Sequence, residues 1–275
     1  MPELQASIEQ AAQWVAEAPA ILITAGAGMG VDSGLPDFRG PQGLWKAYPA
    51  LGKNNWNFRE VASPQAFRLN PGLAWGFYAH RLQTYRNVQP HAGFNILWRW
   101  GRRAPNGYRV FTSNVDGHFQ KAGFDPSLVA ECHGSLHYME CLEGCASESW
   151  SADGFEPQFV SSQDLQLATL PVCPQCGSLA RPNVLMFDDW RWVGDAYEHA
   201  VNEVAAWRNR HAAQLLVIEL GAGLDIPTVR YFGERGKKRF IRINLREPNV
   251  PSSRSALGIA GKALDVLQRM DELLV

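Results

Sequence analysis

The chain has 275 residues, with 26 Lys and Arg against 27 Asp and Glu, and a formal net charge of −1. Its 46% hydrophobic and 19% charged residues exclude a disordered chain, and the neutral charge balance argues against a nucleic-acid binder. No apolar run reaches the roughly 18–20 residues of a membrane span, and the acidic start at residues 1–5 is unlike a secretory signal. We therefore expect a cytoplasmic protein with neither a nucleic-acid nor a membrane partner.

Apolar runs alternate with amphipathic segments along the chain. The predicted elements are, in chain order, a helix at 4–17, strands at 20–24, 108–112, 214–220 and 239–244, and a helix at 261–274. This alternation predicts an α/β fold with a doubly wound, Rossmann-like parallel sheet, in which ligands bind at the carboxyl ends of the strands. An aromatic stretch at 41–90 and a cysteine-bearing stretch at 137–181 interrupt the pattern, and we interpret them as a helical insertion and a small inserted module. The chain 1–275 is then one domain, whose core consists of 1–40, 91–136 and 182–275.

A glycine-rich loop, Ala25-Gly26-Ala27-Gly28, follows the first predicted strand directly. Glycines there would let backbone N–H groups approach a pyrophosphate at the start of the next helix. However, the next glycine, Gly30, comes too early for the G-x-G-x-x-G spacing, and no acidic residue that would bind a ribose ends the second strand in the usual place. The loop alone therefore leaves a dinucleotide site and a tight strand-to-helix turn both open.

Four of the five cysteines form two close pairs, Cys141-x3-Cys145 and Cys173-x2-Cys176. Two thiolate pairs with a long separation suit one tetrahedral zinc ion, and reactive thiols are the alternative. Because protein sulfur would fill every ligand position, we expect a structural zinc in this inserted module rather than a catalytic one. The fifth cysteine, Cys132, stands apart as a small buried residue.

A series of motifs, in order along residues 8–274, resembles the sirtuins of bacterial type, which are NAD-dependent protein deacylases. The motifs are Gly26-Ala27-Gly28 with Gly34-Leu35-Pro36-Asp37-Phe38-Arg39, Thr112-Ser113-Asn114-Val115-Asp116-Gly117, Cys132-His133-Gly134-Ser135, the cysteine pairs, Arg181-Pro182-Asn183-Val184-Leu185-Met186-Phe187, Gly221-Ala222-Gly223 and Ile243-Asn244. The resemblance implies an enzyme that uses NAD to deacylate lysines of proteins, and that releases nicotinamide and 2′-O-acyl-ADP-ribose. It also implies a structural zinc ion.

The resemblance assigns roles to individual residues. His133 would be the general base, a role that suits a neutral imidazole, and Asn114 would be the second catalytic residue. A structural histidine and a turn at 113–117 are the alternatives. The residues that would hold NAD are Ala25, Gly26, Ala27, Gly28, Asp37, Phe38, Arg39, Ser113, Asn114, Asp116, Gly221, Ala222, Gly223, Asn244 and Ala263. Val184 and Phe187 would contact the substrate.

Tyr78 and Arg81 lie three residues apart and so share a helix face. They resemble the Tyr-x-x-Arg pair of the sirtuins that remove acidic acyl groups, in which a phenol and a guanidinium bind a distal carboxylate. The alternative is an amphipathic helix with the tyrosine in the core and the arginine on the surface. On the first interpretation the deacetylase also removes succinyl or malonyl groups.

Several positions depart from the sirtuin pattern. Ser113 replaces a glutamine, His118-Phe119 replaces Leu-His, and Asp188-Asp189 replaces the glycine that starts the peptide-binding strand. Two carboxylates there would alter strand pairing with a peptide or favour basic peptides. These changes keep open ADP-ribosyl transfer or NAD hydrolysis on the same scaffold, and also a non-catalytic NAD-binding interaction protein. We expect a monomer that acts on acyl-lysine proteins.

Overall fold

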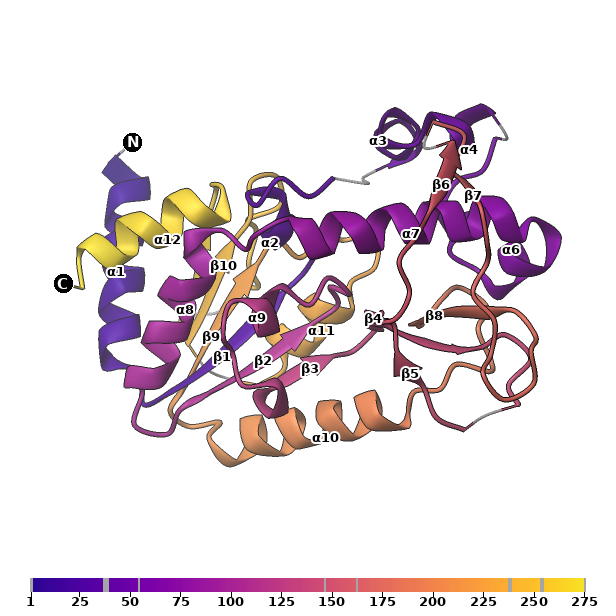
Figure 1. Ribbon diagram of the computed structural model, residues 1–275. Helices are drawn as coiled ribbons and strands as arrows, with labels where there is room; N and C mark the ends of the chain where they lie inside the picture. Colours follow the sequence, from indigo (N-terminus) through magenta and orange to yellow (C-terminus); the bar gives the residue numbers. More distant parts are fainter. Residues whose placement is uncertain are drawn as a thin grey trace.

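The computed structural model describes residues 2–36, 40–53, 55–145, 147–161, 163–236, 239–252 and 255–274. At its centre lies a six-stranded sheet in the order β11-β10-β9-β1-β2-β3, with all neighbouring strands parallel (Figure 1). The strands are β1 (Ala20–Ala25), β2 (Tyr108–Thr112), β3 (Val129–Glu131), β9 (Leu215–Leu220), β10 (Arg239–Ile243) and β11 (Ala256–Ile259). The predicted parallel α/β sheet is confirmed.

The strand order reverses beside β1. The chain builds β1, β2 and β3 toward one edge, and then returns to β9 on the other side of β1 before continuing to β10 and β11. Ala25 pairs with Thr112 on one side and with Leu220 on the other, so three strands end at the same level. In doubly wound sheets this reversal opens a crevice at the carboxyl ends of the strands, which is where ligands bind. We call the loops after β1, β2, β3, β9 and β10 the sheet rim.

Helices cover both faces of the sheet (Figure 1). One face carries α1 (Pro2–Glu17), α8 (Ala92–Arg103) and α12 (Ala263–Glu272), and the other carries α10 (Asp195–Arg210) and α11 (Thr228–Glu234). The helices α1 and α12 contact each other, which brings the two ends of the described chain together. Among the described residues, we find no helix that combines the length and the apolar character needed to cross a bilayer.

The two interrupting stretches form one unit beside the sheet. Its helices are α3 (Gly40–Ala47), α4 (Pro49–Lys53), α5 (Phe58–Val61), α6 (Pro64–Leu69) and α7 (Pro71–Asn87), and its strands are β4 (Gly134–Cys141), β5 (Trp150–Ser151), β6 (Phe159–Ser161), β7 (Gln166–Leu167) and β8 (Ala180–Val184). They share one hydrophobic core. Trp75 of α7 donates to the carbonyl of Ala180 in β8 (2.7 Å), and a Cβ on Gly76 would lie 1.8 Å from the carbonyl oxygen of Leu165. The helical stretch (41–90) and the cysteine-bearing stretch (137–181) therefore stabilise each other.

Three short elements complete the described fold. They are α2 (Gly28–Val31), α9 (His118–Lys121) and the 3-10 helix η1 (Pro126–Leu128). Both α2 and α9 begin directly after the loops that leave β1 and β2, so they start at the sheet rim.

Candidate active site

The loops after β1 and β9 contact each other backbone to backbone. The N–H of Gly26 donates to the carbonyl of Leu220, and the N–H of Gly28 donates to that of Gly221, both at 3.0 Å. A Cβ on Gly28 would lie 2.7 Å from Cα of Gly221, and one on Gly221, whose φ is +59°, would lie 2.4 Å from the carbonyl carbon of Gly28. Only glycine permits this approach. These two N–H groups, which we expected to face a phosphate, are therefore used to join the loops.

A pocket of about 100 Å³ opens beside this contact, at the ends of β9 and β10 and the start of α12. The residues that line it are Gly28, Val31, Asp32, Gly221, Ile243, Asn244, Leu245, Arg246, Gly261, Lys262 and Ala263. Four of the predicted cofactor residues thus meet at one pocket, namely Gly28, Gly221, Asn244 and Ala263. Ala222 and Gly223 follow Gly221 in the same loop. We call this part of the sheet rim the adenosine end, after the part of NAD that the resemblance would place at Asn244.

Asn244 shapes the adenosine end through its side chain. Its amide group donates to the carbonyl of Ala222 (2.9 Å), and its Oδ1 accepts the N–H groups of Arg246 and Glu247, both at 3.0 Å. The side chain is 3% exposed. Because its amide already has these partners, Asn244 ties the loop after β9 to the loop after β10.

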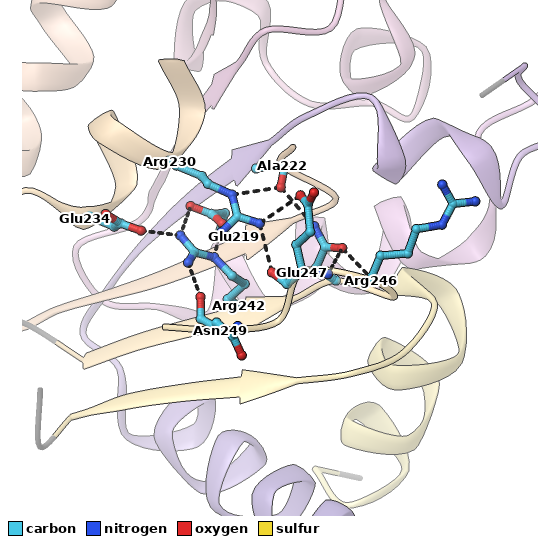
Figure 2. A network of polar contacts seen from close by, with 9 residues as sticks. Glu219, Ala222, Arg230, Glu234, Arg242, Arg246, Glu247 and Asn249 are labelled. Atoms are coloured by element: carbon cyan, nitrogen blue, oxygen red, sulfur yellow. Dashed lines mark hydrogen bonds and ion pairs between the residues drawn. The ribbon is translucent and has the colours of Figure 1, made fainter. Parts of the chain in front are cut away.

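A buried charge network backs these loops (Figure 2). Glu219 and Arg242 pair across β9 and β10, with Nε of Arg242 at 2.5 Å from Oε1 of Glu219. Nη2 of Arg242 also donates to Glu234 of α11 (2.6 Å). Both Glu219 and Arg242 are buried, and two buried charges are stable together only when their hydrogen bonds are made.

Arg230 of α11 extends the network to the pocket. It donates from Nε to the carbonyl of Ala222 (3.0 Å), and from Nη2 to the carbonyl (2.8 Å) and the carboxylate (3.3 Å) of Glu247. We did not predict this network. The sequence does contain a signal for it, since Glu219 and Arg242 each stand one residue before the last residue of an apolar strand.

The loops after β2 and β3 form the second part of the rim, which we call the catalytic end. Thr112 pairs with Glu131 in the sheet, and the N–H of Cys132 donates to the carbonyl of Thr112 (2.8 Å). Asn114 and His133 each follow this pair by two residues. The structure therefore places both predicted catalytic residues just beyond the carboxyl ends of the neighbouring strands β2 and β3.

Asn114 and Asp116 are both buried after β2. The hydroxyl of Thr112 accepts the N–H of Asn114 (3.0 Å), and Oδ1 of Asp116 accepts the N–H of His118 (2.9 Å). The turn interpretation thus holds for the backbone. Yet Nδ2 of Asn114 finds no hydrogen-bond partner in the described part of the chain. A buried donor without a partner in the chain can donate to a ligand or to an ordered water.

His133 precedes a tight strand start. Gly134 has a φ of +78°, and a Cβ on it would lie 2.3 Å from the carbonyl oxygen of Asn183, so β4 begins hard against β8. The carbonyl of His133 accepts the N–H of Leu185 (3.0 Å). Burial lowers the pKa of His133, which keeps its imidazole neutral at pH 7, the form that a general base requires.

Two other titratable groups stand beside His133. Burial raises the pKa of the Cys132 thiol to about 12, so this cysteine is no nucleophile at neutral pH. Burial also raises the pKa of Glu131 to about 8, with a further contribution from the charge of Asp116. We did not predict a role for Glu131.

Tyr78 and Arg81 lie inside the core of the second unit, on α7. The side chain of Arg81 donates from Nε and Nη2 to the hydroxyl of Tyr85 (3.1 and 2.8 Å), and its Cζ lies 5.6 Å from the centre of the Tyr78 ring. Burial acts to lower the pKa of Arg81, but Tyr85, Tyr78 and Tyr48 hold it above the ordinary value. At 8% exposure, Arg81 is not the surface arginine of the alternative interpretation.

The segment after β8 corrects one expectation. Asp189 is not open to a peptide, because its carboxylate accepts two bonds from the buried Arg181 (2.7 and 2.9 Å). Arg181 also pairs with the buried Glu140. Only Asp188, with a φ of +56°, reaches the surface, where it pairs with Arg59 (3.4 Å). The segment therefore presents one carboxylate, and that one is balanced by an arginine.

The predicted substrate residues flank this segment. Val184 is buried and pairs with Gly134, directly after His133. The N–H of Phe187 donates to the carbonyl of Ala62 (2.9 Å), and its ring lies 4.8 Å from the guanidinium of Arg59. Asp37, Phe38 and Arg39 lie outside the described residues. Ser113 anchors the catalytic end by donating its N–H to the carbonyl of Ala25 (3.2 Å).

The four paired cysteines meet at the far end of β4 and β8. Their sulfur atoms all lie within 4.8 Å of one another, with 3.6 Å between Cys141 and Cys176 and 3.4 Å between Cys145 and Cys173. Tetrahedral zinc with Zn–S bonds of about 2.3 Å needs sulfurs about 3.8 Å apart. Gly177, with a φ of +73°, makes the turn after Cys176. The donor set fits a structural zinc ion.

Comparisons with known proteins identify the family of this chain. The model of the Sir2 family matches residues 26–228. An NAD-dependent protein deacylase of Thermococcus kodakarensis is 29% identical over 261 residues, which are 94% of this chain and 93% of that protein. One of Leptospira interrogans is 30% identical over 248 residues, 89% of each chain. A mutant Sir2 homologue solved with ADP-ribose superposes with a TM-score of 0.71 at 25% identity, over 96% of each chain. The chain therefore belongs to the Sir2 family, the sirtuins.

Proposed function

We propose that this chain is an NAD-dependent protein lysine deacylase that releases nicotinamide and 2′-O-acyl-ADP-ribose, with His133 as the general base. The observation that carries this proposal is the catalytic end, where Nδ2 of Asn114 has no partner among the described residues and the half-buried His133 has a lowered pKa. The curated relatives in Thermococcus kodakarensis and Leptospira interrogans are NAD-dependent protein deacylases. The contact between the glycine loops and the adjoining pocket supply the place for a dinucleotide.

Bound NAD would supply an activated ribose carbon and the group that accepts the acyl chain. Nδ2 of Asn114 would donate a hydrogen bond to the bound molecules, which satisfies its buried amide. Asp116, whose carboxylate already orders the start of α9, would accept from the nicotinamide amide. The imidazole of His133 would take a proton from a ribose hydroxyl, and its lowered pKa leaves it free to do so near neutral pH.

The zinc ion would stabilise the fold and would take no part in the reaction. Cys141 ends β4, the strand that begins at Gly134 directly after His133, and β4 pairs with β8 at both of its ends. Four protein sulfurs fill a tetrahedral ion, so no position remains for a substrate. Zinc-binding thiolates need a reducing compartment, which supports a cytoplasmic location. The protein would act on acyl-lysine proteins as a monomer.

Product analysis tests the activity. The zinc-loaded protein is incubated with NAD and a mixed set of acyl-lysine peptides, and the products are identified by mass spectrometry. We expect 2′-O-acyl-ADP-ribose and deacylated peptide. Protein-bound or free ADP-ribose would instead indicate ADP-ribosyl transfer or NAD hydrolysis, and unconsumed NAD would indicate a binding protein.

Two histidine variants, one at the proposed base and one at an exposed position, are the matched pair for this test. His133→Ala should abolish the acyl product, since general bases contribute roughly 10²–10⁴-fold. His199→Ala, at an exposed histidine of α10, should leave it unchanged. Acyl transfer that survives in His133→Ala at the wild-type rate would refute the assignment of the base.

For the acyl group, we propose that Tyr78 and Arg81 bind a distal carboxylate, so that succinyl- or malonyl-lysine is a substrate beside acetyl-lysine. The support is the buried guanidinium of Arg81 among tyrosine rings on α7. A buried cation favours an anionic ligand, and guanidinium matches carboxylate geometry.

The ratio of kcat/KM for succinyl- over acetyl-lysine peptide measures this preference. We expect Arg81→Met to lower the ratio by roughly tenfold or more and Tyr78→Phe to lower it less, because Arg81 carries the charge. Arg103→Met, at an exposed arginine of α8, is the matched control. Thermal unfolding of each variant separates a changed preference from a damaged core. An unchanged ratio in a folded Arg81→Met variant would contradict the proposal that Arg81 binds the distal carboxylate.

A further inference from the structure

The segment that joins β8 to α10 carries an exposed tryptophan. At 93% exposure, Trp190 is the most exposed large hydrophobic side chain of the described chain, and its ring contacts no aromatic or guanidinium group among the described residues. An indole stabilises a fold mainly through its burial, so one that is left in water contributes little to stability. The indole of Trp190 is therefore available to a partner.

A buried carboxylate fixes the segment on one side of this indole. Asp189 accepts two hydrogen bonds from the guanidinium of Arg181 (2.7 and 2.9 Å) and one from the N–H of Met186 (3.3 Å). The side chains of Asp189 and Arg181 are buried, and Arg181 also pairs with the buried Glu140. Opening this triad would leave a buried charge without its partner, so the turn at Asp189 is held in place.

The segment is fixed on the other side of the indole as well. The ring of Trp192 stacks on that of Tyr197 in α10, with 5.5 Å between the ring centres and 17° between the planes. The N–H of Val193 donates to Glu140 (2.8 Å), and its carbonyl accepts Nδ2 of Asn183 (3.0 Å). The exposed indole therefore projects from a short stretch that is anchored at both ends, and little backbone freedom would be lost when it binds.

The exposed charges that flank Trp190 along the chain are paired. Asp188 pairs with Arg59 (3.4 Å), and Arg191 pairs with Glu143 (3.9 Å). A charged partner residue would have to compete with these pairs, whereas an apolar residue needs only to cover the indole. The surface around Trp190 therefore favours an apolar or aromatic side chain.

Trp190 is within reach of the proposed base. The segment starts at Leu185, whose N–H donates to the carbonyl of His133 (3.0 Å) and which is itself 38% exposed. Trp190 follows Leu185 by five residues. At no more than about 3.6 Å per residue, this stretch spans at most about 18 Å. An extended substrate advances about 3.3 Å per residue, so its residues up to about five positions from the reacting lysine can reach Trp190.

We propose that Trp190 is a specificity-determining residue, which binds an apolar or aromatic side chain of the acyl-lysine protein within about five residues of the acylated lysine. Tryptophan is enriched among the residues that carry most of the binding energy of interfaces, and here the loop presents it in a fixed position. The inference rests on the proposed function, because it takes the substrate to be a polypeptide whose acyl-lysine reaches His133.

A positional scan of substrate peptides tests the proposal. The zinc-loaded full chain is assayed with NAD and peptides that carry the acyl-lysine it turns over best. Each of the five positions on either side of the lysine is set in turn to Leu, Phe, Arg or Asp in an alanine background. We expect Leu or Phe at one position or more to raise kcat/KM about tenfold over Ala. A scan in which no apolar residue raises kcat/KM by more than about twofold would overturn the proposal.

Variants of exposed aromatic residues locate the effect. In Trp190→Ala the ratio of kcat/KM for the apolar over the alanine peptide should fall to near one, and Trp190→Phe should keep part of it. Tyr231→Ala removes an aromatic side chain that is 64% exposed on α11, and should retain the wild-type ratio. Thermal unfolding should be nearly the same in all of them, because each side chain lies largely in water.

Two results would contradict the assignment of Trp190. One is an apolar preference that survives in Trp190→Ala, and the other is a preference for Arg over Leu that disappears in Trp190→Ala. If the peptides are deacylated without any preference for an apolar neighbour, only this inference fails. If wild type releases no acyl product from any acyl-lysine peptide, the proposed function fails.

Discussion

The adenosine end and the catalytic end of the sheet rim treat their buried polar groups in opposite ways. At the adenosine end, Arg242 is bonded to Glu219 and Glu234, and the amide of Asn244 has partners on both of its atoms. At the catalytic end, Nδ2 of Asn114 and both ring nitrogens of His118 are buried without a hydrogen-bond partner in the described part of the chain.

This difference separates two tasks. Groups that are satisfied within the chain hold a loop in one shape before any ligand arrives. Buried groups left open destabilise the folded protein and are satisfied by a bound molecule, so the bonding they offer is available for catalysis. Substitutions at the adenosine end should therefore cost mainly stability, and substitutions at the catalytic end should cost mainly activity.

The largest effect on stability should come from Arg242→Met. It leaves Glu219 buried without its cation, and breaking a buried pair in this way costs about 3–5 kcal/mol. Urea unfolding of wild type and variant at pH 7 measures the loss. It should also loosen the loop that carries Asn244 and so weaken binding of ADP-ribose.

A double variant separates the effect of an unpaired buried charge from the effect of lost packing volume. Arg242→Met combined with Glu219→Leu removes both charges and keeps apolar volume, so most of the lost stability should return. A single variant that costs less than about 1 kcal/mol would show that the network does not hold the adenosine end.

At the catalytic end, Asn114→Ala should lower kcat/KM by about 10²-fold, the scale of one preorganised donor. Its free energy of unfolding should stay within about 1 kcal/mol of wild type, because Nδ2 of Asn114 has no partner to lose among the described residues. Deacylation assays and urea unfolding on the same preparation test both halves. Asn202→Ala, at an exposed asparagine of α10, is the control. A large loss of stability with normal kcat/KM would place Asn114 with the structural groups.

The two ends also differ in how much of their structure could be predicted from the sequence. Apolar runs sufficed to predict β1, β2, β9 and β10, because a strand that is buried on both faces is apolar throughout. The short strands β3 and β11, of three and four residues, were not predicted. Asn114 and His133 were assigned from the resemblance to the sirtuins, and the structure places each of them two residues beyond the paired residues Thr112 and Glu131. The buried charge network at the adenosine end could not be predicted from the sequence. Pairing Glu219 with Arg242 requires knowing that β9 and β10 are neighbours in register.

Asp189 shows a second limit of sequence reasoning. Beside Asp188 it looked like half of an acidic surface, but the chain turns back after β8 and places it on the buried Arg181. A turn with positive φ at Asp188 makes this reversal. Local composition says nothing of such a return, just as it did not show that residues of 41–90 and 137–181 share one core.

Glu131 gives a pH-dependent test of the catalytic end. Burial, with the charge of Asp116, raises its pKa to about 8, well above the ordinary value near 4.5. The protonated carboxyl therefore contributes stability that is fully present below about pH 4.5 and is lost as the pH rises through about 8. Glu131→Gln keeps the neutral form at every pH.

We therefore expect Glu131→Gln to match wild type near pH 4.5 and to exceed its free energy of unfolding by a margin that grows as the pH rises to 8.5. Urea unfolding across this range measures the difference. Glu203→Gln, at an exposed glutamate of α10, should show no such trend. A difference that stays constant with pH would mean that Glu131 is ionised in the folded protein. The catalytic end would then carry a second fixed negative charge next to Asp116, and the contrast with the neutralised adenosine end would rest on Asn114 and His118 alone.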